Sequence, residues 1–166
     1  MAFRVAYTPI TEYESPMPTI GWSDDLSIDD SQIDFQHRQL LDAIGDLEDA
    51  LAAGDPQRVA QAMPFLRLYA QVHFVDEERV LGLIGWPELA QHQKMHESFR
   101  QRLGELEGAV RRGDMAAGAT LLGFLAAWLS GHIRGEDRRF AEPLRSLRSQ
   151  TATSAKPQKS QPDPKF

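Results

Sequence analysis

Residues 73–96, HFVDEERVLGLIGWPELAQHQKMH, contain the end of one predicted helix and the start of the next. Gly85 lies where the helical pattern stops, and glycine commonly follows the last turn of a helix. Pro87 comes two residues later, and proline suits the first turn of a helix because the N–H that it lacks would have no partner there. The stretch therefore predicts two consecutive helices joined by a short turn.

Each of these two helices carries a pair of potential metal ligands four residues apart. His73 is followed by Glu77, and His92 is followed by His96. Four residues turn an α-helix by about 400°, so the two side chains of a pair project from one face, one turn apart. This spacing lets one helix supply two ligands to one metal ion or to two adjacent ions. Taken alone, either pair is weak evidence, because such pairs also occur on ordinary helix surfaces.

The helical pattern continues on both sides of this stretch. Gly54-Asp55 and Gly113-Asp114 repeat one signal, in which a glycine ends a helix and an aspartate caps the next. Pro64 should kink or break the helix that contains it, because it removes a backbone donor. Four helices are therefore predicted, at residues 33–53, 56–84, 87–112 and 115–143.

Four helices with three short connections favour an all-α, up-down-up-down four-helix bundle, which we expect over residues 31–148. Residues 1–30 are rich in Pro, Thr, Ser and acidic residues with scattered aromatics, and we expect them to form an arm that packs on the bundle. Residues 149–166 are polar and rich in Pro, Lys and Gln, which predicts a disordered tail. Periodicity alone is also compatible with a structural bundle that holds no cofactor.

The composition excludes several classes of function. A chain of 166 residues is long enough for one domain with a buried core. It has no cysteine, which removes disulfides, iron–sulfur clusters, thiolate zinc sites and thiol nucleophiles together. The net charge of -6 disfavours nucleic acid and anionic membranes as partners, because their phosphates would be repelled. The first residues do not resemble a signal peptide, and no apolar run approaches the roughly 20 residues that span a bilayer, so we expect a cytoplasmic protein.

All five histidines fall on predicted helices, and every predicted helix carries at least one. They are His37, His73, His92, His96 and His132. His132 is followed five residues later by Asp137, which adds a third pair on the last helix. Burying so many imidazoles without partners would be costly, and metal binding would compensate for that cost. The complete use of the histidines therefore favours a metal site over a purely structural bundle.

The joint pattern resembles the hemerythrin family, and in particular its single-domain bacterial type. The matching stretches keep their order and spacing across residues 22–140. They are Gln36-His37, His73-Phe74 with Glu77-Glu78, His92 with His96, and Trp128-Leu129 with His132-Ile133 and Asp137. No ligand position of the family's pattern is missing.

This resemblance implies a centre of two iron ions joined by a bridging oxygen. The implied ligands are His92, His96 and His132 for one ion, His37 and His73 for the other, and Glu77 and Asp137 as bridges between the two. One coordination position then stays open on the ion with two histidines. The implied function is reversible binding of O2, for carriage, storage or sensing, rather than catalysis.

Apolar residues are expected around the open position, where they would exclude water. Counting from the ligands, they are Leu40, Phe74, Trp128, Leu129 and Ile133. The same residues would belong to the core of any bundle. Gln36 and Asp34 are candidates for hydrogen bonds to the ligands, although a solvated helix start is the better default for Asp34.

His132 and Asp137 cannot share one face of a regular α-helix. Five residues rotate by about 500°, which leaves the two side chains about 140° apart. If both reach one centre, the helix should widen into a π-type turn, or the side chains must wrap sideways. Gly131 and Gly135 would ease such a distortion.

Three other functions remain open. A di-iron redox enzyme, such as a peroxidase, an oxidase or an NO-handling protein, is the main alternative. Oxygen-activating ferritin-like sites are rich in carboxylates and use Glu-x-x-His pairs, whereas here five histidines accompany two carboxylates at wider spacings, which favours carriage. A sensor would need a partner, which only the arm or the tail could bind. Iron handling is poorly served by one fixed site.

Overall fold

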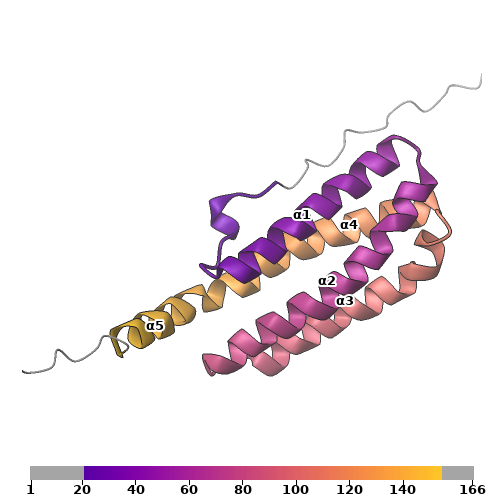
Figure 1. The fold of residues 1–166 in the computed structure, drawn as a ribbon. Helices are drawn as coiled ribbons and strands as arrows, with labels where there is room; N and C mark the ends of the chain where they lie inside the picture. The colour runs from indigo at the N-terminus through magenta and orange to yellow at the C-terminus, as the bar shows by residue number, and fades with distance from the viewer. Residues whose placement is uncertain (1–20, 155–166) are drawn as a thin grey trace, which may run out of the picture.

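The computed structural model describes residues 21–154, and the side chains of residues 21–150. Within these residues the chain forms helices and turns but no strand. The elements are η1 (Asp24–Leu26), α1 (Ser31–Ala52), α2 (Pro56–Leu83), α3 (Leu89–Val110), α4 (Met115–Gly131), η2 (His132–Asp137) and α5 (Arg138–Ser154). Helix α1 packs on α2 and α4, and α3 packs on the same two helices. Figure 1 shows α4 and α5 running on as one long rod, with α1 beside α4 and α2 beside α3. This arrangement confirms the all-α four-helix bundle.

Local sequence signals explain where the helices begin and end. Asp55 and Asp114 cap α2 and α4, each accepting hydrogen bonds from two backbone N–H groups of the first turn. Gly113 ends the connection after α3 in a left-handed conformation with φ +74°. Its Cα lies so near Pro56 that an added Cβ would be 2.7 Å from a proline carbon and from the proline carbonyl oxygen. This position therefore requires glycine for both its backbone and its packing.

The structure differs from two predictions that were based on prolines, a kink or break at Pro64 and the end of the last helix near Pro143. Helix α2 continues through Pro64 without a break. The last helix does not end near Pro143 but continues to Ser154. Continuing the helix buries Leu144, which is 5% exposed, and this burial offsets the hydrogen bond that the proline removes. The helix therefore enters the stretch predicted as a tail, whose residues 155–166 lie outside the described part of the chain.

The arm is described only from Gly21, since residues 1–20 lie outside the described residues. Leu26 and Ile28 are buried, and the guanidinium of Arg38 lies 3.8 Å from the centre of the Trp22 ring. The backbone N–H of Ile28 donates a 2.9 Å hydrogen bond to Asp34 on α1. This described part of the arm therefore packs on the bundle, and Asp34 holds the arm rather than a ligand of the predicted centre.

The core occupies the length of the bundle between the four helices. Fully buried side chains from every helix contribute, among them Leu40, Leu66, Phe99 and Leu121. The helical stretch Met115–Gln150 contains a window long and apolar enough to cross a membrane. It corrects the expectation that no apolar run approaches that length. Because the core helix of a bundle meets the same criteria, the finding is weak evidence for a membrane.

Candidate metal centre

The predicted ligands meet inside the bundle, although they come from four separate elements of the chain. Helix α1 supplies His37, α2 supplies His73 and Glu77, α3 supplies His92 and His96, and η2 supplies His132 and Asp137. Each of these seven side chains is at most 4% exposed. The structure therefore brings the complete predicted set together in the buried interior of the bundle.

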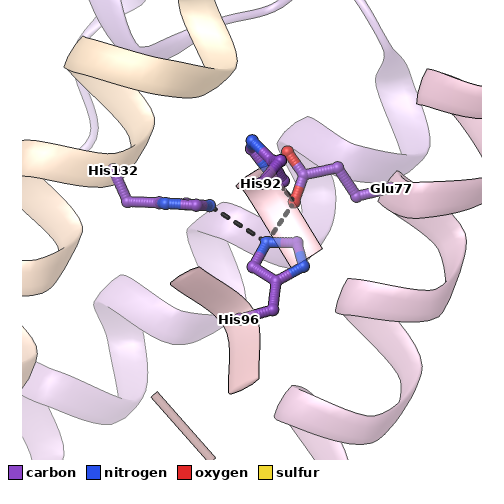
Figure 2. A group of neighbouring side chains, drawn as sticks. All are labelled: Glu77, His92, His96 and His132. Atoms are coloured by element: carbon purple, nitrogen blue, oxygen red, sulfur yellow. Dashed lines mark hydrogen bonds and ion pairs between the residues drawn. The ribbon is translucent and has the colours of Figure 1, made fainter. Parts of the chain in front are cut away.

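Four of these residues form a compact group, shown in Figure 2. The members are Glu77, His92, His96 and His132, and one ligand atom from each lies within 4.8 Å of the others. Nε2 of His96 is 3.1 Å from Nε2 of His132 and 3.2 Å from Oε2 of Glu77. Nitrogen and oxygen atoms that converge in this way are spaced as the ligands of one ion.

Asp137 lies between this group and the remaining histidines. Its Oδ1 is 3.2 Å from Nε2 of His132, and its Oδ2 is 3.5 Å from Nε2 of His37. Glu77 also reaches both sides, because its Oε2 is 3.6 Å from Nε2 of His73 as well as close to His96. The two carboxylates thus stand between a group of three imidazoles and a group of two.

The helix geometry that delivers Asp137 is the predicted π-type turn. Residues His132–Asp137 form a π-helix, and the N–H of Arg138 bonds to the carbonyl of Ile133, five residues earlier. Widening the turn places side chains five residues apart on nearly the same face. The prediction of a local distortion between His132 and Asp137 is therefore confirmed.

Buried polar atoms without partners are concentrated in this cluster. Among the described residues they are Nδ1 and Nε2 of His37, Nε2 of His73 and His92, both carboxylate oxygens of Glu77 and Asp137, and the hydroxyl of Tyr69. Leaving one such atom unsatisfied costs about 1–3 kcal/mol. A cation bound between these atoms would satisfy them together, and imidazoles with carboxylates suit iron and similar transition metals. The residues present therefore fit a metal site.

Burial keeps four of the histidines in the neutral form that binds metals. Burial lowers the pKa of His37, His73, His96 and His132, so these imidazoles are neutral at pH 7. Burial also raises the pKa of Asp137 well above its ordinary value. A bound cation would favour the ionised carboxylate and offset this effect.

Side chains behind two of the imidazoles hold them in place. Nδ1 of His73 donates to Oε1 of Gln36 at 3.0 Å, and the amide nitrogen of Gln36 donates to Asp76 at 2.8 Å. Nδ1 of His96 donates to Oε1 of Glu78 at 2.8 Å. Each bond leaves the opposite nitrogen, Nε2, free of its proton and directed at the cluster. The sequence prediction included Gln36 but missed Asp76 and Glu78, whose positions beside Glu77 were the available signal.

Two of the five apolar residues predicted around the open position contact the group of three histidines instead. The ring of Phe74 stacks on His96 at 3.8 Å between centroids, and the half-buried Trp128 stacks on His132 at 4.1 Å. The other three are at most 1% exposed: Leu40, Leu129 and Ile133. The ring stacked on His73 at 4.7 Å belongs to Tyr69, which the sequence prediction missed although it precedes His73 by one helical turn.

Comparison with known proteins agrees with this architecture. Residues 29–144, more than half of the chain, match the family model described as the hemerythrin HHE cation binding domain. A bacteriohemerythrin of Stenotrophomonas maltophilia is 30% identical over 136 residues, which cover 82% of this chain and 88% of that protein. One of Pseudomonas aeruginosa is 31% identical over 134 residues, with 81% and 87% covered. One of Clostridium acetobutylicum is 24% identical over 128 residues, with 73% and 98% covered. The chain belongs to the hemerythrin family.

Proposed function

We propose that this chain holds two iron ions in the cluster and binds O2 reversibly at one of them. The observation that carries the proposal is the buried set of seven donor side chains, with two carboxylates placed between three imidazoles and two. The proposed ligands are His92, His96 and His132 for one ion, His37 and His73 for the other, and Glu77 and Asp137 for both.

The difference in histidine number between the two groups indicates where an external ligand binds. The ion held by His37 and His73 has one imidazole fewer than its neighbour, so it retains room for a further ligand. Ferrous iron, when bound, supplies the electrons for reversible binding of O2. Gln36 orients His73 on that ion, and Glu78 orients His96 on the other.

The surrounding side chains keep water from the cluster. Leu40, Leu129 and Ile133 are at most 1% exposed, and Phe74 covers the face of the His96 ring. Apolar packing of this kind limits the entry of water and protons, which would otherwise promote irreversible oxidation. The proposed role of these residues is therefore to protect the bound state, while the ligands assemble the centre.

A di-iron redox enzyme is the second candidate. One observation favours it: the buried hydroxyl of Tyr69 gives the interior a hydrogen-bond donor on a residue next to His73. The histidine-rich ligand set still favours O2 binding over O2 activation.

We further propose that neither nucleic acid nor an anionic membrane is a partner, because the net charge of the chain is -6 and phosphates would be repelled. We also propose that the protein acts in the cytoplasm.

The test combines metal analysis with cycles of O2 exposure. We expect two irons per chain, a visible band that appears when reduced protein is mixed with O2 in a stopped-flow instrument, and loss of that band when O2 is removed. A second cycle should give the same amplitude. One iron per chain would contradict the centre. Irreversible oxidation with released peroxide, or steady turnover with a reductant, would contradict carriage and favour the enzyme.

A further inference from the structure

Tyr69 is a buried polar residue for which the proposed ligand set has no role. Its side chain is 5% exposed, and its hydroxyl has no hydrogen-bond partner among the described residues. A buried hydroxyl without a partner costs about 1–3 kcal/mol, so its presence calls for a partner that binds in the functional state.

The ring of Tyr69 lies against the cluster. Tyr69 lies one turn before His73 on α2, and the two rings are stacked with an interplanar angle of 21°. Both side chains therefore leave one face of the helix in the same direction. The buried ring of Tyr69 therefore lies directly against a proposed ligand of the ion with two histidines.

The hydroxyl of Tyr69 is available as a hydrogen-bond donor. A phenol keeps its proton at pH 7 and can donate one hydrogen bond. Among the unpartnered buried atoms of the described residues, this hydroxyl is the one that belongs to no proposed ligand residue.

We propose that the Tyr69 hydroxyl donates a hydrogen bond to the external ligand that binds at the ion held by His37 and His73. This inference rests on the proposed function, because it needs the ion and its open position. Leu40, Leu129 and Ile133 can exclude water from this interior but cannot donate a hydrogen bond. Tyr69 thus stabilises an anionic ligand, while the apolar side chains limit access.

Azide, an anion that binds open positions on ferric iron, is the probe. The iron-loaded, oxidised full-length protein is titrated with azide and followed by its visible absorption. We expect Tyr69→Phe, which keeps the ring and removes the hydroxyl, to weaken azide binding about 3- to 10-fold, the effect of one hydrogen bond. Its iron content should equal that of the wild type. The metal-free variant should be at least as stable as the metal-free wild type, because an unpartnered buried hydroxyl is gone.

Phe65→Leu is the matched control. Phe65 stacks on Tyr69 with ring centroids 6.3 Å apart, so its replacement disturbs the same packing but keeps the hydroxyl. Azide affinity should then stay at the wild-type value.

Three outcomes would contradict these proposals. Equal azide affinity in wild type and Tyr69→Phe would overturn the inference about Tyr69 but not the proposed function. Loss of iron from Tyr69→Phe would also overturn it, because the hydroxyl would then support the metal ligands. A wild type that loads no iron would overturn the proposed function, and the inference with it.

Discussion

At the scale of single residues, the proposed centre depends on side chains that never touch a metal. His73 is backed by a neutral amide, that of Gln36, whereas His96 is backed by a carboxylate, that of Glu78. A charged acceptor forms the stronger bond and makes the imidazole a better electron donor. The two groups of histidines therefore differ in donor strength as well as in number, which favours unequal roles for the two ions.

Replacing Glu78 with Gln should weaken iron binding. The charged acceptor behind His96 is removed while the shape is kept, and the loss of such a partner typically lowers metal affinity about 10- to 100-fold. Competition with a chelator measures the change. Glu97→Gln is the control, because Glu97 on α3 carries the same charge but is 58% exposed, and its contacts with Arg100 and Gln101 involve no proposed ligand. Equal affinities in the two variants would show that Glu78 has no role in holding the ligand.

Replacing Leu129 with Ala should separate protection of the site from stability. The side chain is fully buried, so its truncation should cost about 2–5 kcal/mol of unfolding free energy and should admit water beside the cluster. We expect faster autoxidation with the iron content retained. Leu47→Ala creates a similar cavity in α1, ten residues and about 15 Å along the helix from His37. If autoxidation accelerates equally in both variants, general loosening of the fold is the cause.

At the scale of elements, the π-turn and the helix connections have different tasks. Residues His132–Asp137 depart from regular α-helix so that two ligands five residues apart can face one centre. The connection at Gly113 involves no ligand, but it closes α3 against the start of α2 with almost no space to spare. The π-turn has an irregular backbone because the site needs it. The connection at Gly113 has a regular role in packing, and that packing permits only glycine at this position.

Gly113→Ala should destabilise the bundle. A non-glycine residue in the left-handed region costs about 1–2 kcal/mol, and the contact with Pro56 adds overpacking of about 1–3 kcal/mol. Gly104→Ala is the control, because an added Cβ there meets nothing within 4 Å inside helix α3. That change should stabilise the protein by up to about 1 kcal/mol through helix propensity. Urea unfolding measures both, and a neutral Gly113→Ala would contradict the close approach.

At the scale of the whole molecule, the bundle buries a polar cluster that it cannot satisfy by itself. The seven donor side chains are buried in a mainly apolar core, and most of the unpartnered buried atoms among residues 21–150 belong to them. A bound cation would remove this cost in the folded state alone, so metal binding should add to the stability of the fold. Metal binding and folding are therefore expected to stabilise each other, because the metal ligands lie in the core.

The metal-free protein should lose stability as the pH falls below about 6.5. In the fold, burial lowers the pKa of His37, His73, His96 and His132 below the ordinary value of 6.5. The unfolded chain then binds more protons than the folded chain, and acid favours unfolding. The raised pKa of Asp137 acts in the opposite direction, but it is one group against four.

Urea unfolding of the metal-free protein between pH 7 and pH 5 checks this prediction. The midpoint should fall with the pH. The iron-loaded protein should unfold at a higher midpoint at pH 7, since the metal binds the folded state. A midpoint that stays constant or rises on acidification would show that the histidines are not held neutral in the fold.

The sequence by itself was sufficient for the four helices, for most of their limits and for the candidate ligands. Helix caps, glycine stops and ligand pairs such as His92 and His96 involve residues at most about four positions apart. Such signals can be read from the sequence because they depend on the geometry and hydrogen bonds of a single helical turn. The π-type turn also followed from local spacing, because five residues cannot share a face of a regular α-helix. The assignment of all seven residues as metal ligands stays a prediction.

The tertiary structure alone decided which side chains meet across helices. It turned Asp34 toward the arm and stacked Phe74 and Trp128 on the group of three histidines. It buried the hydroxyl of Tyr69 without a partner in the part of the chain that the structure describes. It also carried the last helix past Pro143, where burial of apolar surface outweighed one lost hydrogen bond. Such contacts depend on the rotation and axial register of packed helices. Periodicity determines which face is buried, but not which neighbour each buried side chain touches.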